Sequence, residues 1–199
     1  MSHQPTNHHP HLIPSELGAA LKLIRDSDAW WAEVCCLLFM AFTVTRSSEA
    51  GSATWDEIDW ETNTWHIPAA RMKGGRPHAV PLSSQAMEIL TYAKARTNGD
   101  GPIFPAKRSG KCLASARLSA LMRRLGIPAT PHGIRSSFIN WAMERPEIVA
   151  TTAYQVLAFK LHPPDLAAFL DGESFRERRR VMQMWADYLT ATMGPVAPQ

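Results

Sequence analysis

Two basic residues lie three positions apart at the expected start of a helix. His132 and Arg135 follow Pro131, and at that spacing their side chains share one face of the helix. The positive end of the helix dipole then points toward whatever they hold, which favours an anionic ligand. In the alternative, His132 caps the helix while Arg135 forms a surface ion pair. The spacing alone favours this alternative.

Two further basic residues, Arg46 and Lys73, could also take part in binding an anion. Arg46 comes at the predicted C-terminal end of the most apolar helix, where a cation is costly unless it has a partner or a function. Its simplest role is to interact with the helix dipole and to pair with Glu49. Lys73 precedes a glycine turn, where a lysine is usually solvated but can reach a neighbouring site from a rigid two-residue hairpin. The residues alone do not show that the four cations meet.

Composition limits the classes of protein to consider. The 199 residues, 45% of them hydrophobic, predict one globular domain with a substantial core. A net charge of +3 permits contact with a polyanion without requiring it. Cys35, Cys36 and Cys112 are too few for a disulfide framework or a zinc site, so we expect a reducing, cytoplasmic location.

The first residues show no signal peptide, because they are polar and rich in His and Pro. A disordered tail explains the cluster of His8, His9 and His11 better than a metal site does, and we expect no metal or other cofactor. Residues 30–44 are strongly apolar, but they are shorter than the ~20 residues that span a bilayer. They predict a buried helix, and we expect no contact with a membrane.

The expected elements form a mostly α (α+β) domain with one small three-stranded antiparallel sheet. Alternation in WDEIDWETNTWHIP predicts two strands around an Asn-Thr turn, and Gly74-Gly75 predicts a second turn before a strand that ends near Val80. Ser15 and either Ser83 or Ser84 are the expected helix caps. The predicted helices cover residues 15–26, 28–46, 84–97, 114–125, 132–144, 146–161 and 174–193. The predicted domain covers residues 14–193, between disordered tails at 1–13 and 194–199.

Several segments together resemble the catalytic domain of phage-type integrases, the tyrosine recombinases. TRSSEAGSATWDEIDWETNTWHIPAARMKGGRPHAVPLS resembles the first catalytic box and the β-hairpin of that family, and PHGIRSSFINWA resembles its second box. IFPAKRSGKCLASARLSALMRRLG and the terminal RRRVMQMWADYL are also similar to the family. The likeness runs from about residue 14 to residue 189.

The resemblance implies a role for each cation. Arg46 and Arg135 would clamp the scissile phosphate, because planar guanidinium groups match the charged oxygens of a phosphorane-like state. Lys73 would protonate the 5′-oxygen leaving group, and His132 would act in proton transfer with the attacking hydroxyl. Glu49 would position Arg46. No metal is required.

The likeness breaks at two aromatic positions. Phe159 stands where the family has a histidine, and Phe169 stands where it has the nucleophilic tyrosine. A phenyl ring cannot attack phosphorus, so we expect DNA binding without cleavage. Tyr154 or Tyr188 are weak substitutes, since both are expected to be packed, and His162 can partly replace the lost histidine. An engineered change would account for Phe169 but not for Phe159, which favours natural loss.

Double-stranded DNA is the partner that the resemblance implies, and a small-molecule substrate is not expected. We expect a monomer without DNA and self-association on DNA. The RERRR run from Arg176 is equally well explained as a solvated helix face. Three hypotheses follow: an inactivated recombinase domain, a non-catalytic DNA-binding module, and a scaffold without DNA contact, which the four cations disfavour. The candidate phosphate contacts outside the active site are Lys107, Arg108, Lys111, Arg117, Arg123 and Arg124.

Overall fold

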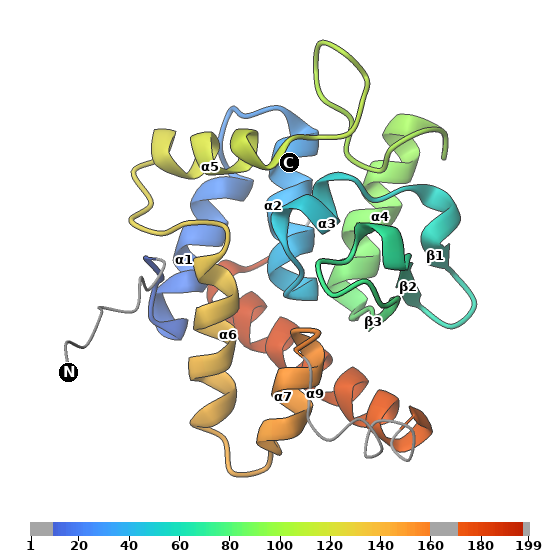
Figure 1. Cartoon of the computed structure of the whole chain (residues 1–199). Coiled ribbons are helices and arrows are strands. Elements are labelled where there is room, and N and C mark those ends of the chain that lie inside the picture. Colours follow the sequence, from blue (N-terminus) through green and yellow to red (C-terminus); the bar gives the residue numbers. More distant parts are fainter. Residues whose placement is uncertain (1–9, 160–170, 197–199) are drawn as a thin grey trace, which may run out of the picture.

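Helix α2 (Trp31–Thr43) lies at the centre of the molecule, with the other helices around it and a small sheet to one side (Figure 1). A computed structural model describes residues 10–159 and 171–196. The predicted mostly α fold with a three-stranded sheet is confirmed. The other helices are α1 (Pro14–Arg25), α3 (Ser47–Gly51), α4 (Ser84–Thr97), α5 (Ser115–Arg124), α6 (Gly133–Met143), α7 (Ala150–Val156) and α9 (Asp171–Met193), and the 3₁₀ turns are η1 (Trp55–Glu57) and η2 (Ala69–Arg71).

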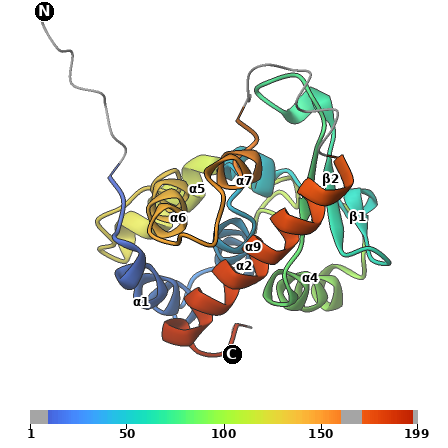
Figure 2. The ribbon, with the colours of Figure 1, turned by 90° about the horizontal axis from the view of Figure 1, so that it is seen from below.

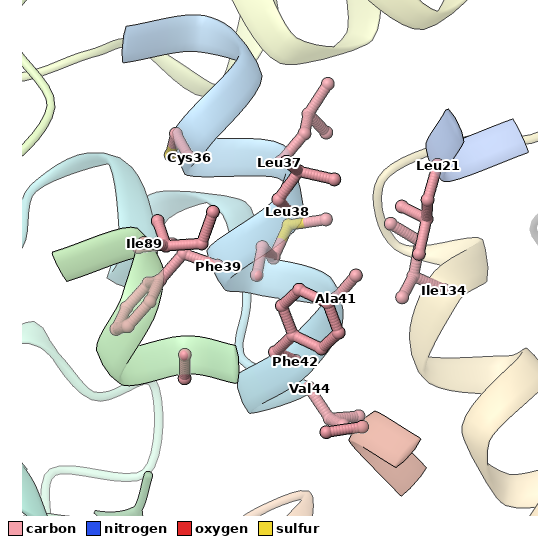
Figure 3. Packing of buried hydrophobic residues seen from close by; sticks show 14 of the residues in the cluster. Leu21, Cys36, Leu37, Leu38, Phe39, Ala41, Phe42, Val44, Ile89 and Ile134 are labelled. Carbon is pink, nitrogen blue, oxygen red and sulfur yellow. The ribbon is translucent and has the colours of Figure 1, made fainter. Parts of the chain in front are cut away.

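The core forms around α2, which is buried on all sides from its second residue to its last. Figure 3 shows Leu21 of α1 and Ile134 of α6 on one side of α2 and Ile89 of α4 on the other side. The Phe39 ring of α2 also lies 5.2 Å from the Trp65 ring and 5.5 Å from the Phe104 ring. Burying one large apolar side chain contributes roughly 1.5–3 kcal/mol, so α2 is the main source of cohesion.

The sheet has the order β1-β2-β3, with both pairs antiparallel. Its strands are β1 (Ile58–Asp59), β2 (Thr64–Ile67) and β3 (His78–Pro81). Trp65 pairs with Ile58 on one side and with Val80 on the other. Because the Trp65 indole is fully buried, its N–H needs a partner, and it donates to Glu57 Oε2 at 2.9 Å.

The expected two-residue hairpin at Gly74-Gly75 is wrong. Ten residues, 68–77, connect β2 to β3, and they include η2. Pro68 and Pro77 flank this connection, and neither can donate a main-chain hydrogen bond to continue the ladder. Gly75 does occupy the left-handed region, with φ of +64°, but within a longer loop.

Three helix ends also differ from expectation. Pro14 is the first residue of α1, so Ser15 lies inside the helix and does not cap it. Helix α2 runs from Trp31 to Thr43 rather than from 28 to 46, and Val44 ends it in a left-handed conformation with φ of +55°. Helix α7 stops at Val156, far short of residue 161, and Ala158 is again left-handed.

Helix α9 runs diagonally beneath the molecule, from the sheet to α1 (Figure 2). Two arginines of the RERRR run fix its first half: Arg178 donates to Ala79 O at 2.9 Å and Arg179 to Thr62 O at 2.8 Å. They therefore serve packing and are not simply a solvated face. At the other end, Arg25 of α1 donates to Met193 O at 2.9 Å. No helix within the described part of the chain is long and apolar enough to cross a membrane.

The burial of the cysteines gives a direct test of the core. Cys35 and Cys36 are fully buried on α2, and burial raises the pKa of Cys35 to about 12, whereas Cys112 is exposed. A thiolate is the reactive form, so we expect a thiol reagent to modify one cysteine of the native chain and all three after denaturation. Cys112→Ser should abolish the native reaction. Rapid native modification of Cys35 or Cys36 would contradict this packing.

Candidate active site

Arg135 of α6 is buried, with 5% of its surface exposed. Its guanidinium donates to Val44 O at 2.5 Å and to Leu157 O at 2.7 Å. Burial lowers the pKa of Arg135 to about 10, and the charge of Arg46 lowers it further while Glu49 opposes the shift. Arg135 therefore stays protonated at neutral pH, and the two arginines are close enough to interact electrostatically.

Arg46 lies at the N-cap of α3, not at the C-terminal end of α2. Its Nη1 is 2.6 Å from Glu49 Oε1, and its main-chain N–H donates to Glu49 Oε2 at 2.7 Å. The predicted pairing with Glu49 is thus confirmed, but the predicted interaction with the C-terminal dipole of a helix is wrong. The reason is the turn at Val44, which ends α2 before Arg46 is reached.

His78, the first residue of β3, was not singled out from the sequence. Burial lowers its pKa to about 4, and the charge of Arg178 lowers it too, against the effects of Glu49 and of a hydrogen bond to the main chain of Val156. Arg135 contributes a further, smaller lowering. His78 is therefore neutral at pH 7, and the groups that shift its pKa belong to α3, α6, α7 and α9. A signal was present: His78 shares a strand face with the buried Val80.

His132 is exposed and occupies the N-cap position of α6, where its side chain makes no capping hydrogen bond. It therefore does not play the capping role that the spacing favoured. A hollow of about 520 Å³ opens beside it, and Arg135 also lines that hollow. The complete lining consists of His11, His132, Arg135, Ser136, Ile139, Asn140, Leu157 and Phe159.

Phe159 reaches the same hollow from the segment after α7. Its ring is 49% exposed and its centroid lies 5.9 Å from the Arg135 guanidinium carbon, a cation–π distance. Three of the predicted site residues, Arg135, His132 and Phe159, thus line one hollow, and a fourth, Arg46, interacts electrostatically with Arg135. The predicted nucleophile position, Phe169, lies outside the described residues.

Lys73 is not brought into contact with this group. It is exposed in the connection between β2 and β3, and it makes no hydrogen bond or ion pair with residues 10–159 or 171–196. Two residues earlier, Arg71 donates to Glu49 O at 3.0 Å and to Ser52 Oγ at 2.8 Å, which ties the start of the loop to α3. Lys73 therefore lies on a loop that is fixed next to the Arg46–Glu49 pair.

None of the six candidate phosphate contacts lines the hollow at Arg135, and three of them, Lys107, Arg117 and Arg124, line a second hollow of about 290 Å³. Arg117 pairs with the buried Glu33 at 2.6 Å, and Arg124 pairs with Asp28 at 2.9 Å. Arg123 lines a different hollow, beside Pro128. All six side chains are exposed, and the Lys107 amino group lies 5.5 Å from the Trp30 ring.

Comparison with known proteins identifies the family of this chain. The profile of the phage integrase family matches residues 12–146, which is more than half of the chain. The chain belongs to the phage integrase family. It is 31% identical to prophage integrase IntA of Escherichia coli (strain K12), over 92% of this chain and 45% of that protein. This integrase-family chain spans about half the length of the curated relatives it matches.

Solved structures agree on the fold of this family member. The integrase from mycobacterium phage Brujita matches with a TM-score of 0.64 and 15% identity, over 98% of this chain and 66% of that one. The XerH site-specific recombinase bound to difH substrate, a pre-cleavage complex, matches with a TM-score of 0.62 and 19% identity, over 76% of this chain and 47% of that one. Among the described residues, no group of three His, Cys, Asp or Glu side chains is placed to hold a metal ion.

Glu49→Gln tests the electrostatic support of Arg46. Glu49 is 2% exposed and both of its oxygens bind Arg46, so the substitution removes the negative charge that balances Arg46 and that also acts on Arg135. We expect the free energy of unfolding, measured with urea, to fall by about 1–3 kcal/mol. Glu177→Gln, which breaks the more exposed pair with Arg180, is the control and should cost below about 1 kcal/mol. Equal losses of unfolding free energy in the two variants would contradict the proposed electrostatic support of Arg46 by Glu49.

His78 should make stability depend on pH. Its folded pKa of about 4 lies below the usual 6.5, so the unfolded chain takes up a proton first as the pH falls. The contribution of His78 to stability is therefore complete above pH 6.5 and is lost between pH 6.5 and 4, at about 1.4 kcal/mol per pH unit. His78→Gln should flatten this part of the stability curve, while His66→Gln, at an exposed position of β2, should not. A normal His78 titration by NMR would refute the prediction.

Proposed function

We propose that this chain is the catalytic domain of a site-specific recombinase that binds duplex DNA and holds one phosphate between Arg46 and Arg135, but does not cleave it. The proposal rests on the burial of Arg135 without a paired carboxylate among the described residues. Its guanidinium is buried, is repelled by Arg46 and is bound by two main-chain carbonyls. No carboxylate of the described residues forms an ion pair with it. A buried cation without a direct counterion favours binding an anion.

The geometry of Arg135 suits a phosphate. A guanidinium has five N–H donors in a planar fork, and the carbonyls of Val44 and Leu157 each accept one hydrogen bond from Arg135. The remaining donors can bind phosphate oxygens, and Arg46 can supply a second fork. Arginine keeps its charge throughout a reaction, so the pair can stabilise the negative charge that develops on the oxygens without a metal.

Three further side chains have roles in this proposal. With a hydroxyl restored at position 169, His132 would move a proton to or from that hydroxyl, and Lys73 would protonate the 5′-oxygen leaving group of a strand bound across its loop. His78, which is neutral and close to Arg135, holds β3 to the end of α7. The exposed cations Lys107, Arg108 and Lys111 contact phosphates away from the reaction centre. Arg117 and Arg124 can do so only in competition with Glu33 and Asp28.

The nucleophile is the missing part. Phe169 has no hydroxyl group, and the unreactive ring of Phe159 faces Arg135 where the family pattern has a histidine. Tyr188 stacks on Trp185 with ring centroids 5.9 Å apart, so it serves packing. Tyr154 is 38% exposed, contrary to the expected packing, and its ring lies 6.0 Å from that of Phe159. Of the two tyrosines considered as substitutes, Tyr154 is therefore the one nearer the site.

A second function shares the same binding site. The chain can act as a non-catalytic module that occupies recombination sites, as a monomer in solution that associates with other copies on DNA. The contact between Phe159 and Arg135 favours this version, because an apolar ring occupies a position from which a histidine would act on the phosphate. The two versions differ in whether restoring the hydroxyl restores cleavage.

Phe169→Tyr is the decisive variant. Duplexes that the unmodified chain binds are first selected from a randomised pool and are then supplied with a nick that traps the cleaved intermediate. We expect Phe169→Tyr to form a covalent protein–DNA band on a denaturing gel, because it supplies the hydroxyl that attacks phosphorus. Phe175→Tyr makes the same chemical change on α9, beside Arg178 and Arg179, and should give no band.

Each outcome separates the hypotheses. A band from Phe169→Tyr alone supports an inactivated recombinase domain. A band from the unmodified chain means that another residue attacks, and Tyr154→Phe then tests the nearest candidate. Selected duplexes that bind but are not cleaved by Phe169→Tyr support the non-catalytic module. Failure to select any duplex contradicts both versions.

A further inference from the structure

Residues 10–12, named the strap from here on, lie along the start of α6 just before α1 begins (Figure 2). Thr130 N–H donates to Pro10 O at 3.1 Å, and the Ser137 hydroxyl donates to Leu12 O at 2.6 Å. Leu12 is 8% exposed and belongs to the core. Both ends of the strap are therefore bonded to the segment that carries His132 and Arg135.

Gly133 permits this close approach. A Cβ atom at this position would lie 2.2 Å from Pro10 O and 3.0 Å from the Cα of His11. Any larger residue would therefore push the strap away from α6. The glycine of the sequence PHGIR thus allows the strap to contact the helix, a role that its place in the motif does not reveal.

The strap places one side chain at the site. The Nε2 atom of His11 lies 3.2 Å from Asn140 Nδ2 of α6, and His11 lines the same 520 Å³ hollow as His132 and Arg135. The hollow thus combines two imidazoles, an amide and a guanidinium, and no Asp or Glu is among the described residues that line it.

We propose that His11 is a further DNA-binding residue of this site, which contacts a backbone phosphate of the strand held by Arg135. The inference rests on the proposed function, because it requires DNA in this hollow. An imidazole and a guanidinium that face the same space, without a carboxylate between them, suit the oxygens of a phosphodiester. The segment that leads into α1 then forms part of the phosphate-binding surface.

The test measures the affinity of the protein for a fluorescent selected duplex by anisotropy. His11→Ala removes one hydrogen bond to phosphate and should weaken binding about fivefold. His66→Ala, at an exposed position of β2, makes the same change away from the hollow and should leave the affinity unchanged. Gly133→Ala displaces the strap and should weaken binding about as much as His11→Ala, with circular dichroism confirming that the variant is folded.

Replacing single phosphates by uncharged methylphosphonates distinguishes a direct contact of His11 with phosphate from an indirect structural effect of its substitution. The duplex is prepared with one methylphosphonate at a time, and His11→Ala should cause no further loss at the one position where the contacted phosphate is already neutral. The same fivefold loss at every position would overturn the proposal, as would equal affinities of His11→Ala and His66→Ala.

Arg135→Lys distinguishes a failure of the proposed function from a failure of the proposed role of His11. This variant keeps the charge but loses the planar fork, so its affinity should fall if DNA occupies the hollow. Affinity equal to that of the unmodified chain would overturn the proposed function and the role of His11 together. Reduced affinity of Arg135→Lys with normal affinity of His11→Ala would overturn the role of His11 alone.

Discussion

The guanidinium of Arg135 joins three parts of the chain that are distant in sequence. It extends from α6 to the carbonyl that ends α2, at Val44, and to the carbonyl that follows α7, at Leu157. The site on one side and the core on the other both depend on this bridge. Arg46 follows Val44 by two residues and Phe159 follows Leu157 by two, so fixing the two carbonyls also fixes the start of both functional segments.

This arrangement solves a problem of burial. A guanidinium that is 5% exposed needs hydrogen-bond acceptors, and main-chain carbonyls provide them without neutralising the charge. Glu49 acts on Arg135 only at longer range, since its oxygens are bound to Arg46. The positive charge is thus stabilised enough to be buried but is left able to attract an anion.

Features set by neighbouring residues were predictable from the sequence. Ser83 caps α4, and the three-stranded sheet forms where the alternation and the turn residues indicated. The features that were missed depend on residues far along the chain. Helix α2 ends at Val44, whose carbonyl binds an arginine 91 residues away, and the low pKa of His78 depends on burial and on Arg178 of α9. A local pattern carries no information about such partners.

The carbonyls that hold Arg135 have an evolutionary consequence. Every residue type supplies the same main-chain oxygen, so mutations that change the side chains at positions 44 and 157 leave the acceptors of the arginine in place as long as the backbone path is kept. The hydrogen bonds that hold Arg135 therefore tolerate substitutions at these two positions. On the proposed assignment of Phe159 and Phe169 to the family's histidine and tyrosine positions, the loss of those two side chains leaves the carbonyls that hold Arg135 unchanged for as long as the core folds.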